Sequence, residues 1–281
     1  MVAENDNRLP APILERCSSA TGVSVWTDPC LAAIGIIVAF SERGGGTSPA
    51  PFDSLNLATH VGDDPHAVDT NRTLLLDVLG VAAVRDELVV AEQVHDDRIA
   101  VVTRDHAGAG AFTHGRKPIP AADALITDTV GLPLLMLYAD CVPVVLVATH
   151  PARAVCVVHA GWRGALVRLP GTAARALAAQ ASCQTSDLRA YIGPHVRACC
   201  YEVGDEILSH FCNSFDTIGA VDGRLDLTAA VRESLTESGV GDERIAEVGV
   251  CTRDHTDRFF SYRAAQVTGR HGALAVIAEG E

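Results

Sequence analysis

The feature that most constrains this chain is a series of short, continuous apolar runs rich in Val, Ile, Leu and Ala. Such runs are too short for helices and predict strands that are buried on both faces. The predicted strands are 34–40, 88–91, 99–102, 134–137, 144–148, 154–158, 189–192, 246–250 and 273–277. Several of them follow one another directly between Met136 and His159, which argues against strict alternation of strands and helices. We therefore expect a mixed sheet, or layered sheets, with helices outside.

Helices are fewer and lie between groups of strands. Asp64 is a predicted N-cap, Pro65 a first helical residue and Gly80 the end of that helix. Further helices are expected over 172–180, 201–211 and 228–238. The fold class is α/β, in the layered α+β sense, with mixed sheets and outer helices.

The chain contains no internal repeat and no Pro-, Gly- or Ser-rich linker between comparable halves. Residues 1–30 carry scattered polar residues with weak periodicity, so we expect an N-terminal extension that is partly ordered at best. Residues 31–281 are predicted to form one domain, which we expect to carry the function.

Charge and cysteine content restrict the possible partners. The formal net charge is −13, with 22 basic against 35 acidic residues, which disfavours binding to nucleic acid or to an anionic membrane. No signal peptide or spanning segment is evident, so a cytoplasmic protein is expected. In that compartment we expect the nine cysteines to be buried thiols or metal ligands rather than disulfides. Cys156 and Cys251 lie in apolar runs and are predicted core residues. For the adjacent pair Cys199 and Cys200 we favour a packing role, with a reactive pair as the alternative.

Two histidines and one cysteine stand beside or at the ends of apolar runs and form a candidate metal site. His95 lies between two predicted strands, Cys141 follows Asp140 at a break between strands, and His159 ends the strand 154–158. Imidazole and thiolate are ligands that zinc prefers, and three protein ligands with an open position are typical of a catalytic zinc. Taken singly, each residue has an ordinary explanation as a surface histidine or a core cysteine. The spacing alone is not a metal motif.

Three loops combine glycines or small residues with arginine and aromatic side chains, as binding loops do. The segment 159–164 has two glycines, Trp162 as a stacking face and Arg163 as a donor fork. Segments 40–46 and 259–263, the latter together with Gly269 and Arg270, follow the same pattern. For each arginine, an exposed salt bridge is the competing interpretation.

Seven blocks, in order, carry a resemblance to a known family. They are Phe40-Ser41-Glu42-Arg43, Ser54 to Leu57 with His60 to Asp64, Gln93-Val94-His95, Ala139 to Val144, His159 to Gly164, Cys199 to Gly204 and Phe259 to Arg263. Together these blocks resemble the zinc purine nucleoside phosphorylases of the YfiH type, also described as laccase-domain or polyphenol oxidase proteins. Three positions depart from the family's usual residues: His195, Thr228 with Ala229, and Arg253.

The resemblance implies a single layered domain similar to the catalytic domain of cytotoxic necrotizing factors, with zinc held by His95, Cys141 and His159. It implies phosphorolysis of adenosine, inosine, guanosine and methylthioadenosine, and deamination of adenosine. Purine nucleosides and phosphate are thus the expected partners. For deamination, zinc would lower the pKa of water to about 7 for attack on the adenine, with Asp140 moving the proton. Substrate and phosphate binding are assigned to Arg43, Asn56, Arg163 and Arg263.

Three other functions stay open at the level of sequence. Copper is a possible alternative metal, in a polyphenol oxidase, although oxygen reduction to water needs more copper ligands than one His-Cys-His set supplies. Cys141 is also a possible nucleophile, with His159 or His95 as its base, in a cysteine hydrolase. The last alternative is a metal-stabilised binding protein without catalysis. The sequence does not indicate an oligomeric state.

Overall fold

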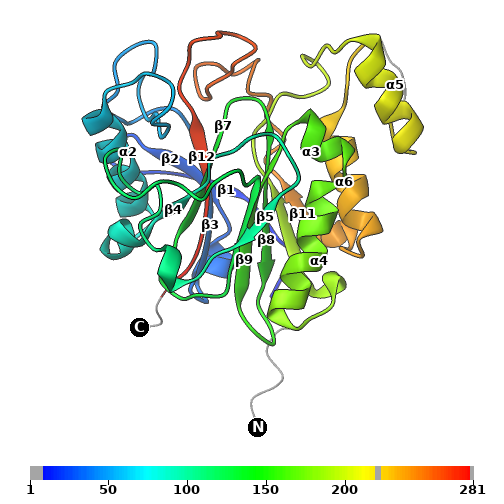
Figure 1. Cartoon of the computed structure of the whole chain (residues 1–281), viewed down its shortest axis with the longest axis horizontal. Coiled ribbons are helices and arrows are strands. Elements are labelled where there is room, and N and C mark those ends of the chain that lie inside the picture. Colours follow the sequence, from blue (N-terminus) through cyan, green and yellow to red (C-terminus); the bar gives the residue numbers. More distant parts are fainter. Residues whose placement is uncertain (1–8, 219–222, 279–281) are drawn as a thin grey trace.

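The computed structural model describes residues 9–218 and 223–278, and the twelve strands of this part of the chain form two six-stranded mixed sheets (Figure 1). The first sheet has the order β1-β2-β3-β12-β7-β4. Its strands are β1 (Glu15–Ser18), β2 (Ser24–Thr27), β3 (Ile36–Ser41), β12 (His271–Ile277), β7 (Leu134–Tyr138) and β4 (Val89–Val90). All of its pairs are antiparallel except the parallel pair β4 and β7.

The second sheet has the order β11-β10-β8-β9-β6-β5. Its strands are β11 (Ile245–Glu247), β10 (Arg189–Ile192), β8 (Val142–Ala148), β9 (Ala154–Ala160), β6 (Ala124–Thr127) and β5 (Ile99–Val101). A hairpin joins β8 to β9 in a register that runs from Val142 opposite Ala160 to Ala148 opposite Ala154. The direct succession of strands predicted for this part of the chain is therefore confirmed.

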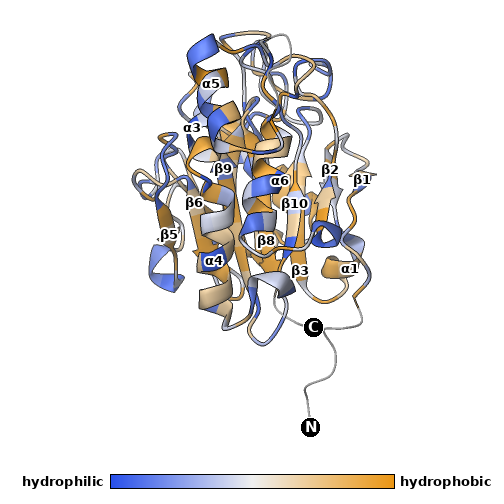
Figure 2. Ribbon diagram, turned by 90° about the vertical axis from the view of Figure 1, so that its right-hand side faces the viewer, coloured by the Kyte–Doolittle hydropathy of each residue, from blue (hydrophilic) through white to orange (hydrophobic). Residues whose placement is uncertain are grey.

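The two sheets pack face to face, which explains why their strands are apolar on both faces. Ile36 and Val38 of the first sheet share a buried core with Val145 and Val157 of the second. The alternate residues of each strand, such as Val144, face a different core on the outside. Figure 2 shows the apolar strands enclosed beneath helices whose outer faces are hydrophilic. The layered, mixed-sheet fold expected from the sequence is present.

Helices cover both outer faces of the sandwich. Helix α2 (Pro65–Val78) packs on the first sheet, while α3 (Trp162–Leu166), α4 (Leu169–Ala181) and α6 (Leu227–Glu237) cover the second (Figure 1). Helix α5 (Asp205–Ser214) lies at one end, and the short α1 (Pro29–Ala32) connects β2 to β3. Four 3-10 segments complete the described structure, at Ala82–Glu87, Arg104–His106, Thr185–Asp187 and Asp242–Arg244. Asp64 caps α2 by accepting from the His66 amide at 3.1 Å, as predicted.

Two expectations need correction. Residues 15–27 are not a weakly ordered extension, because β1 and β2 continue the first sheet by pairing with each other and with β3. The predicted helix over 201–211 begins four residues late, at Asp205. Before it, the backbone of Tyr201 to Val203 forms hydrogen bonds with residues 223–225 instead, which commits the segment to an extended conformation. Residues 1–8 lie outside the described part of the chain. No helix in the described ranges is both long and apolar enough to cross a membrane.

Candidate metal centre and active site

The three predicted metal ligands meet where the chain passes from one sheet to the other. His95 lies in the loop between β4 of the first sheet and β5 of the second. Cys141 lies in the short crossing from β7 to β8, and His159 is near the end of β9, opposite Pro143. One ligand atom from each of the three side chains lies within 4.8 Å of the other two. The topology thus brings together side chains that are far apart in the sequence.

A buried carboxylate, Asp123, holds the loop of His95 in place. Its two oxygens accept hydrogen bonds from the backbone amides of Val94 at 3.1 Å, His95 at 3.0 Å and Asp96 at 2.9 Å. His95 itself has a φ of 62°, a left-handed conformation that residues other than glycine rarely adopt. Three hydrogen bonds from backbone amides to the Asp123 carboxylate stabilise that conformation.

The same carboxylate orients His159. Asp123 Oδ1 lies 2.7 Å from His159 Nδ1, which leaves Nε2 as the ring nitrogen available to a metal. Burial lowers the pKa of His159, but the neighbouring Cys141 and Asp123 outweigh this effect and raise the pKa to about 9. A carboxylate that accepts from the second nitrogen of a metal-binding histidine is a recurrent arrangement, because it fixes the tautomer and the ring direction.

The surroundings of Cys141 favour the thiolate form of its side chain. Burial raises the pKa of its thiol, but the adjacent His159 and His95 outweigh burial and lower the pKa to about 6. The imidazole rings of His95 and His159 meet edge to face with centroids 4.7 Å apart. The lowered pKa of Cys141 and the raised pKa of His159 together favour a thiolate beside a protonated His159 in the absence of a cation.

The donor chemistry fits zinc. In a tetrahedral zinc site with Zn–N of about 2.0 Å and Zn–S of about 2.3 Å, donor atoms lie roughly 3.3–3.6 Å apart, which small side-chain shifts achieve here. Gly161 leaves the necessary room, since a Cβ at this position would lie 3.1 Å from His95 Cδ2 and 3.2 Å from Cys141 Sγ. Three protein ligands leave one position for a reactant. The same set also accepts copper.

The three ligands line a cavity of about 1230 Å³. Its walls carry aromatic faces and a group of basic side chains, which in the described residues are Phe112, Trp162, Tyr201 and Tyr262 together with His60, Arg72, Arg116, Lys117, Arg163, Arg263 and Arg270. The cavity is large enough for a nucleoside and a small anion together.

None of the five cavity arginines forms an ion pair within the described residues, and three of them, Arg163, Arg263 and Arg270, reach toward aromatic residues of the wall. Arg163 lies over the Trp162 ring at 4.3 Å, and Arg263 lies over Tyr201 at 4.5 Å. Guanidinium groups without carboxylate partners are available to an anionic ligand.

One wall of the cavity is electrostatically positive. Burial lowers the pKa of His60, and the charges of Arg270 and Arg72 lower it further. Arg72 is buried and donates only to backbone carbonyls, those of Leu57, Gly110 and Ala111. The charges that disfavour a protonated His60 favour an anion in the same place.

Arg43 and Asn56 do not line this cavity. Arg43 forms an ion pair with Asp53 at 3.1 Å and donates to the Thr256 carbonyl at 2.7 Å. Asn56 is fully buried and accepts from the Arg270 amide at 2.8 Å, so it fixes the position of a cavity residue. Their assignment to substrate binding stays a prediction.

Asp140 lines the cavity but is held by its neighbours. Its backbone has a φ of 93°, its Oδ1 accepts from the Thr252 hydroxyl at 2.7 Å, and its Oδ2 accepts from the Arg263 amide at 2.7 Å. The side chain therefore positions Arg263 and the β7–β8 crossing. Its role as a proton carrier stays a prediction.

Sequence analysis did not identify Asp123, and it quoted Arg270 without assigning it a role. Asp123 had a signal, because it is a single acidic residue between alanines at the start of the buried strand β6. A charged residue at that place needs a partner. The partners, however, are amides of a distant loop, which only the fold reveals.

Comparison with known proteins places the chain in a family. Residues 37–278 match the family model described as multi-copper polyphenol oxidoreductase laccase. A purine nucleoside phosphorylase of Streptomyces coelicolor is 37% identical over 235 residues, which cover 82% of this chain and 91% of the relative. The purine nucleoside phosphorylase YlmD of Geobacillus stearothermophilus is 34% identical over 256 residues, 88% of this chain and 91% of the relative.

The fold agrees with these sequence matches. The crystal structure of YlmD from Geobacillus stearothermophilus matches with a TM-score of 0.84 at 30% identity, covering 95% of this chain and all of that one. The family model covers most of the sequence, and the relatives align over nearly their full length. This chain therefore belongs to the laccase-like family that includes YfiH and YlmD.

Proposed function

We propose that this chain is a zinc-dependent purine nucleoside phosphorylase. The observation that carries the proposal is the set His95, Cys141 and His159 in one cavity with arginines that have no acidic partner and with aromatic faces. The relatives from Streptomyces coelicolor, Geobacillus stearothermophilus and Bacillus subtilis are named purine nucleoside phosphorylases, which supports the same reaction. The proposed partners are purine nucleosides and inorganic phosphate.

In this reaction an oxygen of phosphate bonds to C1′ of the ribose while the bond from C1′ to the purine nitrogen breaks. The products are ribose 1-phosphate and the free base, which takes up a proton. Arg163, Arg263 and Arg270 would hold the phosphate against the positive charge that develops on the ribose. Trp162 and Tyr262 offer ring faces to the purine.

The metal and its supporting residues have separate roles. A zinc ion bound by His95, Cys141 and His159 would act as a Lewis acid and stabilise negative charge in the reacting molecules. Asp123 fixes the tautomer of His159, and Asp140 holds the Arg263 backbone in place. These two carboxylates would act by positioning groups that contact the substrate.

The proposed substrates are adenosine, inosine, guanosine and methylthioadenosine. We add deamination of adenosine to inosine as a second activity of the same site. The observation in its favour is the three-ligand set, which leaves a position open as hydrolytic zinc sites do. Asp140 would carry the proton between water and the leaving ammonia.

Adenosine separates the two reactions. Zinc-loaded protein is incubated with adenosine, with and without phosphate, and the products are resolved by chromatography. Phosphorolysis gives adenine only when phosphate is present. Deamination gives inosine without phosphate, and inosine or hypoxanthine with it, because inosine is itself a proposed substrate of phosphorolysis. A His95→Ala variant of unchanged folded structure is the control. If the wild-type protein yields no more adenine or inosine than this variant, the proposed function is wrong.

One observation favours a cysteine hydrolase as the second candidate. Cys141, His159 and Asp123 form the nucleophile, base and orienting acid of such an enzyme in consecutive contact. Measuring zinc in Cys141→Ala distinguishes the two functions. Loss of one zinc equivalent together with activity supports the metal enzyme, whereas loss of activity with an unchanged number of zinc equivalents supports the nucleophile.

Copper-dependent oxidation of phenols remains the other candidate, and the description of the family model favours it. All groups of potential metal ligands in the described residues together contain two histidines, His95 and His159. Oxygen reduction at several coppers needs more histidine ligands than this. Oxygen uptake by copper-loaded protein with a phenol tests this activity directly.

A further inference from the structure

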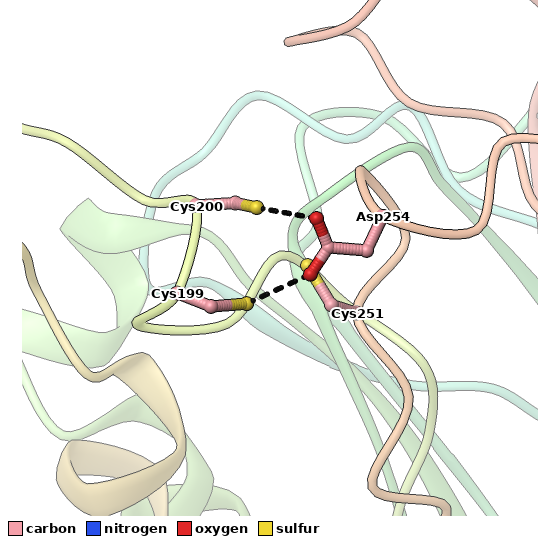
Figure 3. Close-up of side chains that lie close together, drawn as sticks. All are labelled: Cys199, Cys200, Cys251 and Asp254. Carbon is pink, nitrogen blue, oxygen red and sulfur yellow. Dashed lines mark hydrogen bonds between the residues drawn. The ribbon is translucent and has the colours of Figure 1, made fainter.

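A second group of potential metal ligands lies outside the candidate active site. Cys199 and Cys200 belong to the turn after β10, and Cys251 and Asp254 belong to the segment after β11. Backbone pairing brings the two segments together. Cys251 and His195 form an isolated parallel β-bridge, and the Thr252 amide donates to the His195 carbonyl at 3.0 Å. Figure 3 shows the four side chains at this junction.

The four side chains point toward one another. One ligand atom from each lies within 4.8 Å of the other three. The Cys200 thiol donates to Asp254 Oδ1 at 2.9 Å, and the Cys199 thiol donates to Asp254 Oδ2 at 3.1 Å (Figure 3). Cys200 and Cys251 are buried, whereas Cys199 and Asp254 are exposed. The cluster therefore has an inner half in the protein and an outer half open to solvent.

This arrangement differs from ordinary packing of cysteines. A buried cysteine usually behaves as a small apolar side chain, but here two thiols converge on one carboxylate beside a third sulfur. In a tetrahedral zinc site, three sulfurs and one oxygen lie about 3.5–3.8 Å apart. The four ligand atoms, all within 4.8 Å of one another, reach this spacing by shifts of about 1 Å.

Neighbouring groups suit an anionic metal cluster. The Arg197 amide donates to Cys251 Sγ at 3.5 Å, as amides around metal-bound thiolates do. The exposed Arg253 guanidinium interacts with Cys200, and Arg253 is one of the positions that depart from the family pattern. A divalent cation with three thiolates and one carboxylate carries net negative charge, which these donors stabilise.

We propose that Cys199, Cys200, Cys251 and Asp254 bind a thiophilic divalent cation, with Zn²⁺ as the probe, at a second site that supplies four protein ligands. Each coordinating thiol gives its proton to solvent, so binding releases protons. Zinc binding at this site therefore strengthens with rising pH.

The site would cross-link two segments that form a wall of the cavity. Tyr201 follows Cys200 directly, and Thr252 follows Cys251 and donates to Asp140. Arg263, further along the second segment, donates to the Glu202 carbonyl at 2.6 Å. A cation here would stabilise the wall without contacting a substrate. This inference does not depend on the proposed function.

The experiment uses the full chain with the first site removed. A His95→Ala/Cys141→Ala double variant is stripped with a chelator and titrated with Zn²⁺ and with Co²⁺. We expect one equivalent of Zn²⁺ to bind and Co²⁺ to give thiolate charge-transfer absorption. Adding Cys199→Ser or Asp254→Asn is expected to weaken Zn²⁺ binding at least tenfold. Cys17→Ser, which changes an exposed cysteine outside both clusters, is the matched control and should have no effect.

A second readout does not depend on variants of the new site. Zn²⁺ should protect Cys199, Cys200 and Cys251 from alkylation in the double variant, as peptide mapping would show. Absence of a bound equivalent, or equal weakening by Cys17→Ser, would overturn the proposal. Recovery of a disulfide among these three cysteines after purification under reducing conditions would also overturn it, in favour of a redox pair.

Discussion

At the scale of single residues, Asp123 connects the two histidines of the candidate metal site. It accepts from the amides of the His95 loop and from the His159 ring. Sequence analysis could identify His95, Cys141 and His159 because their residue types are metal ligands. It could not identify Asp123, since the role of a carboxylate depends on which amides and rings the fold places around it.

Asp123→Asn is expected to weaken zinc binding about 10- to 100-fold, because an amide orients the His159 ring less well than a carboxylate. Competition with a chelator of known affinity measures this loss. Asp28→Asn is the matched control: Asp28 is also fully buried and accepts from backbone amides, but it lies at α1. If zinc affinity falls by the same factor in both variants, Asp123 acts only by stabilising the fold and not by orienting His159.

Gly161→Ala is expected to reduce both zinc affinity and activity, because the new methyl group would lie against His95 and Cys141. Gly204→Ala tests the same chemical change where a Cβ would meet no atom within 4 Å. Zinc content and turnover are measured for both variants, together with their melting temperatures, so that a loss of zinc is not mistaken for a loss of stability. Unchanged zinc content in Gly161→Ala would show that the ligands do not need this space.

Two residues that depart from the family pattern are in contact. His195 Nε2 lies 2.8 Å from the Thr228 hydroxyl, and both side chains are buried. His195 Nδ1 lies 2.8 Å from the Gly193 carbonyl. The pair joins the end of β10 to α6, so these two departures form one structural unit that sequence analysis treated as separate positions.

At the scale of elements, apolar runs predicted the central strands because both faces of those strands are buried. They did not predict β1 and β2, since β1 is exposed along its whole length and shows no apolar pattern. Backbone pairing with β2 attaches β1, and Glu42, directly after β3, adds ion pairs with Arg16 of β1 at 2.8 Å and with Arg258. Such a long-range ion-pair network cannot be inferred from local sequence.

The Glu42 network predicts a specific acid sensitivity. Burial raises the pKa of Glu42, but Arg16 and Arg258 outweigh it and lower the pKa from 4.5 to about 2. A carboxyl whose pKa is lower when folded stabilises the fold above pH 4.5, and this contribution is lost as the pH falls toward 2. The contribution is about 3 kcal/mol at most.

Glu42→Gln should therefore lower the free energy of unfolding at neutral pH and flatten its decline between pH 4.5 and 2. Denaturant titrations across this range measure both effects. Glu87→Gln is the control, because it removes an exposed ion pair with Arg104 that is worth about 1 kcal/mol or less. Equal effects of the two variants would contradict the importance of the buried network.

At the scale of the whole molecule, the candidate metal site lies between the two sheets rather than within one of them. His95 and Cys141 sit on the loops that connect the sheets, and His159 belongs to the second sheet. The sequence predicted layered sheets and convergence of the ligands. Arg163 and Arg263 were predicted to bind substrate or phosphate, and both line the cavity. The cavity itself and the wall residues Arg72 and Arg116 could not be predicted, because loops from distant parts of the chain form its walls.

Removing the metal should consequently destabilise the sandwich as a unit. At a zinc concentration of 100 times the dissociation constant, binding stabilises the folded state by about 2.7 kcal/mol. For a chain of this size, chelation should lower Tm by several degrees. Calorimetry with zinc and with chelator measures the shift, and the His95→Ala/Cys141→Ala variant should show a smaller one. An identical shift in that variant would place the stabilising metal elsewhere.

The separation of ligands from cavity walls has a consequence for how such a protein diversifies. Strand β9, the short β7–β8 crossing and the buried carboxylate of Asp123 fix the candidate metal ligands, whereas the basic and aromatic wall residues around positions 112–118, 201 and 262–270 belong to loops. Lengthening or rewriting those loops leaves the reactive centre intact. A change of specificity in such a protein therefore requires changes in these loops and none in the candidate metal ligands.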